Sequence, residues 1–80
     1  MSWRLDLTRP LKPVDHPPLR NLDDAWAYIR RLPESLALQD AWLYATELLL
    51  TAADFKNAAS IRAATDHVET ALFFAARLDA

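Results

Sequence analysis

The sequence predicts a mostly helical protein, in which an N-terminal extended or β-hairpin arm precedes a three-helix bundle. Two observations predict this fold. The first part of the chain alternates polar and apolar residues and then carries four of the five prolines. The remainder places apolar residues at helical spacings of three and four. At 80 residues the chain forms a single domain, with the arm in residues 1–21 and the helices in residues 22–80.

The arm begins with a predicted strand over residues 2–8. Polar and apolar residues alternate there without a break, which places Trp3, Leu5 and Leu7 on one face. The proline-rich segment that follows is expected to be an extended loop, because proline fixes φ and donates no backbone hydrogen bond. A lone strand needs a partner. That partner is either the stretch around residues 19–22 or the same strand of a second chain.

The first helix is expected over residues 22–32. Asn21 suits the N-cap, two aspartates in the first turn and two arginines in the last turn complement the helix dipole, and Pro33 ends the helix. The apolar face of this helix consists of Leu22, Ala25, Trp26, Ile29 and Leu32.

Two longer helices are expected over residues 36–53 and 58–78, with Asp54 and Asn57 as the alternative N-caps of the second. The apolar face of the first includes Leu38, Ala41, Trp42, Ala45, Leu48, Leu49 and Ala52. That of the second includes Ile61, Ala64, Val68, Ala71, Leu72, Ala75 and Leu78. The three helices are expected to pack around Trp26, Ile29, Trp42, Leu49, Val68 and Leu72.

The composition excludes several classes of site. There is no cysteine, which rules out disulfides and thiolate metal ligands and favours a cytoplasmic protein. There is no glycine, which rules out the glycine-rich phosphate loops and disfavours left-handed helix caps. We expect no signal peptide and no membrane association, because no apolar run approaches the roughly 18 residues of a bilayer span.

The charge is unevenly distributed. Four basic and two acidic residues give residues 1–20 a charge of +2, whereas five basic and nine acidic residues give residues 21–80 a charge of −4. The net charge of −2 argues against a dedicated nucleic-acid-binding protein. As an alternative function, a small nucleic-acid-associated protein would use Arg4, Arg9, Lys12, Arg20, Arg30 and Arg31.

Catalytic and metal-binding patterns are weak. His16 and His67 lack the spacings of metal-binding or catalytic motifs, and no serine has the flanking glycines of a nucleophile elbow. We therefore expect no enzyme, cofactor or metal. A second alternative is a small-ligand or metal-binding helical module built on His67 and the carboxylates Asp40 and Glu47.

An apolar surplus points instead to association. Leu36, Leu43 and Leu50 repeat every seven residues outside the main apolar face, and Phe73 lies on the polar face of the last helix. A small chain with such a surplus usually meets a partner. The leading hypothesis is a non-enzymatic protein-interaction or regulatory domain that associates with itself, as in a homodimer, or with another protein. The candidate interface residues are Trp3, Leu5, Leu7, Leu36, Leu43, Leu50 and Phe73.

The order of these features resembles a family of short bacterial proteins, a domain of unknown function from rhizobia and their relatives. The resemblance is carried by the alternation over residues 3–7, the segment 22–26, the Arg-Leu-Pro of residues 31–33 and the Ala/Arg/aromatic pattern of residues 58–76. It implies a short β-hairpin followed by three helices. It implies no activity, and no functional residue is carried over from it.

Overall fold

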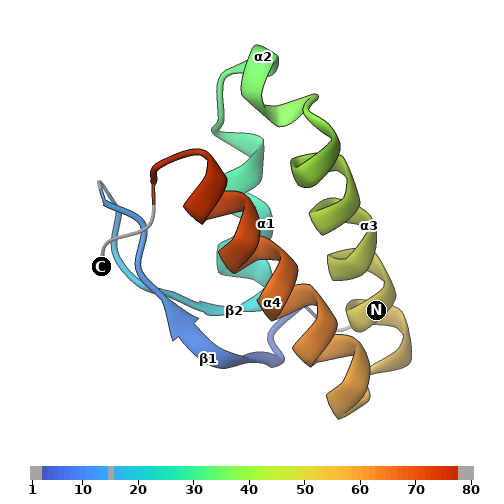
Figure 1. Ribbon diagram of the computed structural model, residues 1–80. Helices are drawn as coiled ribbons and strands as arrows, with labels where there is room; N and C mark the ends of the chain where they lie inside the picture. The colour runs from blue at the N-terminus through green and yellow to red at the C-terminus, as the bar shows by residue number, and fades with distance from the viewer. Residues whose placement is uncertain (1–2, 15, 78–80) are drawn as a thin grey trace.

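A computed structural model describes residues 3–14 and 16–77 and confirms a two-stranded antiparallel hairpin followed by three main helices packed together (Figure 1). The elements are β1 (Asp6–Leu11), β2 (Leu19–Asn21), α1 (Leu22–Arg30), α2 (Glu34–Ala37), α3 (Asp40–Phe55) and α4 (Ala58–Phe74). The hairpin packs on α4 and α1, and α3 packs mainly on α4 and then on α1. No helix among these residues is long and apolar enough to cross a membrane.

The first strand is displaced from the predicted range 2–8. β1 instead runs from Asp6 to Leu11 and contains Pro10, which the sequence analysis assigned to a loop. The alternation continues through this segment, with Leu7 and Leu11 buried and Pro10 on the exposed side. The register is irregular between Asp6 and Leu11, and proline is tolerated in strands at such edges and bulges.

The strand finds its partner within its own chain. β1 and β2 pair antiparallel, with Asp6 opposite Asn21 and Leu11 opposite Leu19. Ahead of β1, the carbonyl of Leu5 accepts a 3.0 Å hydrogen bond from the N–H of Leu22. The predicted pairing with residues 19–22 is confirmed, so this strand does not need the same strand of a second chain as its partner.

Asparagine side chains cap the starts of α1 and α4. The Asn21 side-chain oxygen accepts a hydrogen bond of 2.8 Å from the N–H of Asp24, and that of Asn57 accepts one of 2.8 Å from the N–H of Ser60. Both follow from the preference of asparagine for the N-cap. Asn57 is therefore the N-cap of the last helix, and the other candidate, Asp54, lies within α3.

The helix ends correct the expectation that a chain without glycine avoids left-handed caps. Lys56 after α3 and Ala76 after α4 have φ values of 59° and 56°. After α4, the N–H of Arg77 donates to the carbonyl of Leu72 and that of Ala76 to Phe73, which is a Schellman motif. α4 therefore ends at Phe74, before the predicted end at residue 78, which lies outside the described residues.

The helix predicted over residues 36–53 is divided. α2 is a separate turn, and α3 begins at Asp40 because Gln39 adopts an extended conformation that interrupts the helical hydrogen bonds. Leu36 packs against the core from α2, whereas Leu38, expected on the apolar face, is 59% exposed. α1 is also shorter than predicted, ending at Arg30, although Leu32 beyond it is buried.

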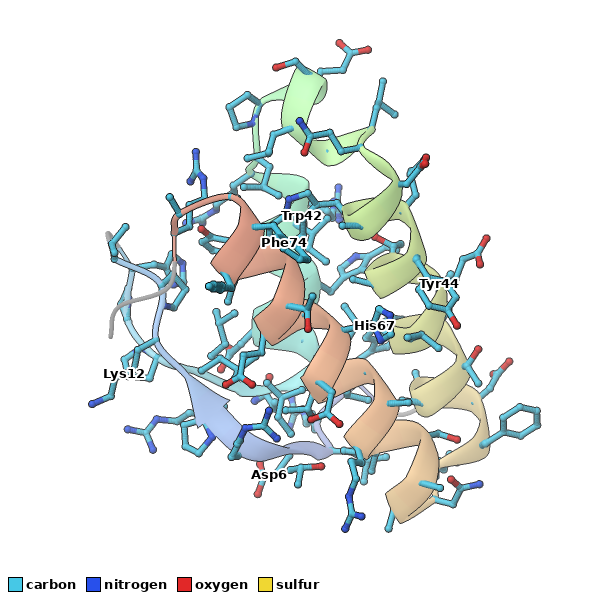
Figure 2. All side chains as sticks on the ribbon, in the orientation of Figure 1. Asp6, Lys12, Trp42, Tyr44, His67 and Phe74 are labelled. Carbon is cyan, nitrogen blue, oxygen red and sulfur yellow. The ribbon has the colours of Figure 1, made fainter. Side chains whose placement is uncertain are left out.

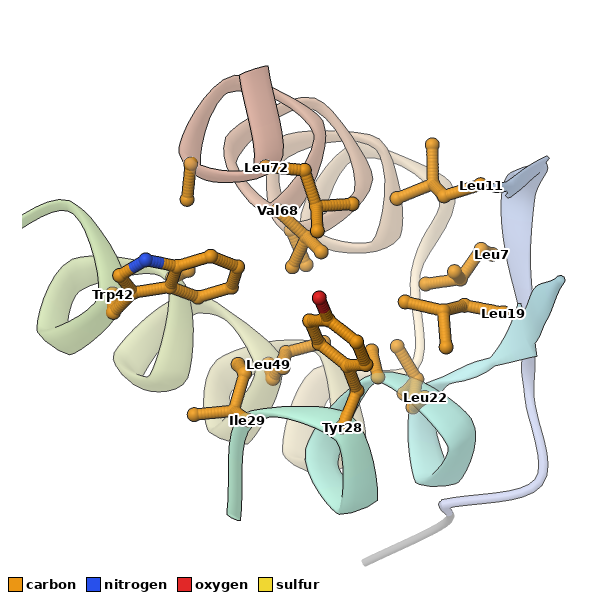
Figure 3. Packing of buried hydrophobic residues seen from close by; sticks show 14 of the residues in the cluster. Leu7, Leu11, Leu19, Leu22, Tyr28, Ile29, Trp42, Leu49, Val68 and Leu72 are labelled. Atoms are coloured by element: carbon orange, nitrogen blue, oxygen red, sulfur yellow. The ribbon is translucent and has the colours of Figure 1, made fainter. Parts of the chain in front are cut away.

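The core lies between the three main helices and the inner face of the hairpin (Figure 3). The prediction for Ile29, Trp42, Leu49, Val68 and Leu72 is confirmed. Trp26 is a correction, because it is only half-buried and its ring lies 5.0 Å from that of Trp3, outside the buried cluster. The core residues that the prediction omitted are chiefly Leu7, Leu11, Leu19, Leu22 and Tyr28.

Candidate interaction surface

The candidate interface residues are not equally accessible. Leu7 is buried in the chain's own core and is therefore not accessible to a partner in this fold. Leu43 and Phe73 are exposed, at 45% and 59%. The other four residues are half-buried: Trp3, Leu5, Leu36 and Leu50. The first three of them pack against the core. The structure therefore does not bring the seven residues together as one open surface.

The largest apolar exposure lies at the C-terminal end of α4. Phe74 is 79% exposed and Phe73 is 59% exposed, and their ring centroids are 5.8 Å apart in an edge-to-face arrangement. We call these two residues the Phe pair. Figure 2 shows Phe74 close to the C-terminal end of α4. Only Phe73 was expected to be exposed, because it interrupts the polar face of the last helix.

A shallow hollow of about 470 Å³ borders the Phe pair, and Glu69 and Thr70 complete its lining. Phe73 follows Glu69 by four positions, and Phe74 follows Thr70 by four positions, so these side chains share the side of α4 that faces away from the core. The hollow is open and mostly apolar, and its charged side chain is the carboxylate of Glu69.

Arg9 of β1 pairs with this carboxylate and with that of Asp66. Its guanidinium donates hydrogen bonds of 2.5 Å to Glu69 and 3.0 Å to Asp66. The hydrogen bond to Glu69, followed by the one to Asp66, raises the pKa of Arg9 above its usual value. Among the described residues these are the two ion pairs, and they leave the end of α4 with an apolar surface beside a charge cluster of one arginine and two carboxylates.

The end of α4 is fixed in place by the fold. The carbonyl of Arg77 accepts a hydrogen bond of 2.7 Å from the N–H of Val14, which ties the Schellman turn to the hairpin loop. The Arg77 guanidinium lies 3.4 Å from the hydroxyl of Tyr28. The Phe pair therefore projects from an anchored helix end, which lowers the entropy that ordering it on a partner would cost.

The two histidines make structural contacts. The His67 ring meets that of Tyr44 edge-to-face at 4.6 Å, across α4 and α3 (Figure 2), and His16 meets Tyr28 at 5.2 Å. Within residues 3–14 and 16–77, no three metal-ligating side chains gather in one place. The metal-binding form of the module around His67, Asp40 and Glu47 is therefore not assembled by the described part of the chain. Its small-ligand form stays a prediction.

The basic residues are dispersed. Arg9 is engaged with α4, and Arg30 and Arg31 lie at the C-terminal end of α1, beside a second open hollow bordered by Ala27. Arg4, Lys12 and Arg20 are exposed on the hairpin side. The six residues of the nucleic-acid alternative thus do not form one continuous basic groove, which such binding would favour.

Comparison with known proteins gives no relative: no family model, no curated protein and no solved structure matches the chain. The resemblance to the bacterial hairpin-plus-three-helix family therefore stays a prediction.

Proposed function

We propose that this protein is a non-enzymatic association domain that binds a second copy of itself through the Phe pair. The observation that carries this proposal is the exposure of Phe73 and Phe74, at 59% and 79%, on a chain whose own core is closed. Seventeen hydrophobic side chains fill that core, and no described buried side-chain polar atom lacks a partner. The Phe pair is thus not needed to complete the fold.

Aromatic side chains at a rigid site are the usual anchors of protein interfaces. Full burial of one phenylalanine contributes about 1.5–3 kcal/mol, so two pairs in a symmetric dimer supply a substantial favourable term. The cluster of Arg9, Asp66 and Glu69 beside them provides a polar rim in which Arg9 pairs with both carboxylates. The result expected is a modest, concentration-dependent homodimer.

Sedimentation equilibrium tests the proposal. The wild type is measured from about 10 µM to about 1 mM, the range in which weak dimers form. The buffer contains about 500 mM salt, which screens charge–charge attraction. The test variant is Phe73→Ser/Phe74→Ser, and the matched control is Phe55→Ser, which removes a phenylalanine that is 68% exposed at the end of α3. Circular dichroism verifies that each variant folds.

The proposal expects a dimer in the wild type and in the Phe55 variant, and a monomer in the double variant. A wild type that remains monomeric throughout, or a double variant that dimerises as well as the control, contradicts it.

A further inference from the structure

The solvent side of α3 is an acidic helix face that no other element covers. Asp40, Glu47 and Asp54 are exposed and are spaced by seven residues, so they lie along one line of the helix. Leu43 and Tyr44 are exposed beside this line, at 45% and 49%. No basic residue occurs between Arg31 and Lys56. This surface, which we call the α3 face, combines negative charge with apolar side chains.

The outer side of the hairpin has the opposite charge. Along β1 and its flanks, residues alternate between the core and solvent, and the solvent-facing positions include Arg4, Asp6 and Lys12. Arg20 is exposed on β2. Figure 2 shows Lys12 pointing away from the body of the molecule. Three basic side chains against one acidic side chain make this surface, the hairpin face, net positive.

The opposite charges of these two faces are not in contact within one molecule. The hairpin packs on α4 and α1, which separate it from α3 (Figure 1). The molecule measures 29 × 23 × 17 Å, so charges on opposite sides are separated by more than the Debye length of about 10 Å at 0.1 M salt. Among the described residues, both ion pairs are made by Arg9, which points inward to α4. Only a second molecule can therefore bring the two faces into contact.

We propose that the hairpin face of one copy docks on the α3 face of another, head to tail. Charge complementarity orients the encounter, and Leu43 and Tyr44 provide the apolar contact. A head-to-tail contact uses different surfaces on its two partners, so a bound pair leaves the hairpin face of one copy and the α3 face of the other open for further addition. This association is independent of the Phe pair and adds a salt-sensitive mode to it.

Paired charge reversals test this arrangement. Glu47→Lys/Asp54→Lys reverses the α3 face, and the new lysine at position 54 suits the last turn of the helix, where cations are favourable. Lys12→Glu/Arg20→Glu reverses the hairpin face. The matched control is Arg62→Glu, an exposed change on α4 outside both faces. Dissociation constants are measured with a fluorescently labelled chain at about 20 mM and about 500 mM salt.

At low salt we expect each reversed variant to bind itself at least about tenfold more weakly than the wild type does, whereas Arg62→Glu binds as the wild type does. Mixing the two reversed variants restores binding, because the intact hairpin face of one variant is complementary to the intact α3 face of the other. The two reversed faces are complementary to each other as well, so addition can continue in the mixture. The differences disappear at high salt. Equal affinities of the mixed and unmixed variants at low salt overturn the inference, while dimerisation through the Phe pair, measured at high salt, is judged separately.

Discussion

The hydroxyl of Thr65 on α4 accepts a hydrogen bond of 3.0 Å from the backbone N–H of Thr8 on β1, across 57 residues of sequence. Thr65 is fully buried and its hydroxyl donates in turn to the carbonyl of Ile61 at 2.8 Å. The Thr65 side chain therefore provides the hydrogen-bond acceptor for the N–H of Thr8, and it links the hairpin to α4.

Thr65→Val should destabilise the domain by about 1–3 kcal/mol, because the valine keeps the shape but leaves the N–H of Thr8 without an acceptor. Urea denaturation measures the difference. Thr70→Val is the control, since its exposed hydroxyl bonds only to the carbonyl of Asp66 within α4, and it should change stability by less than about 0.5 kcal/mol. Equal effects of the two substitutions would mean that Thr65 does not anchor the hairpin.

Ala76→Gly should stabilise the protein by up to about 1 kcal/mol. Alanine at a φ of 56° is strained, and glycine removes the clash of the Cβ atom that makes this conformation costly. Ala63→Gly in the middle of α4 is the opposite control and should cost about 1 kcal/mol. Thermal melts compare the two, and a loss of stability in Ala76→Gly would show that the left-handed cap is absent in solution.

Leu43→Asp should leave the domain folded, with a cost below about 1 kcal/mol, because this side chain is 45% exposed. Leu49→Asp, one and a half turns further along α3, should unfold it, because Leu49 is fully buried and an unpaired buried charge is very costly. Circular dichroism with a thermal melt separates the outcomes. Unfolding of the Leu43 variant would mean that the leucine repeat belongs to the core.

Arg9→Met should cost less than about 1 kcal/mol, since its partners Asp66 and Glu69 are substantially exposed and water screens the pairs. The hydrogen bonds raise the pKa of Arg9, so this contribution is present below the unfolded-state pKa and is lost only in strong alkali. Between pH 5 and 9, stability differences between wild type and variant should therefore not arise from titration of Arg9. Urea unfolding across this pH range checks the claim, and a loss of the difference near neutral pH contradicts it.

The fold was largely predictable because its signals are local. Asn21 and Asn57 mark helix starts through their own side chains, and the apolar spacing identified most of the core. The prediction that Trp26 belongs to the core was wrong. Its position on the apolar helix face does not determine which neighbour covers it, and its ring pairs with that of Trp3 outside the core. The expectation that helix ends without glycine avoid the left-handed conformation was wrong at Lys56 and Ala76, because tertiary packing tolerates a left-handed residue other than glycine.

The candidate surface was less predictable. Phe73 was identified because it interrupts a polar face, but the exposure of Phe74 depends on where α4 ends and on the absence of any described element above it. Leu7 was expected to be available to a partner but is buried. The apolar side of a strand is available to a partner only where the helices of its own chain leave it uncovered. Both outcomes depend on tertiary packing rather than on local pattern.

The most direct test of self-association through the Phe pair is to map amide chemical shifts by NMR during dilution from about 1 mM to about 10 µM. The buffer contains about 500 mM salt, which suppresses contacts between the charged faces. We predict that concentration-dependent shifts cluster at residues 69–77 around the exposed end of α4. Shifts centred on α3 instead, or no shift anywhere, would contradict the proposed function.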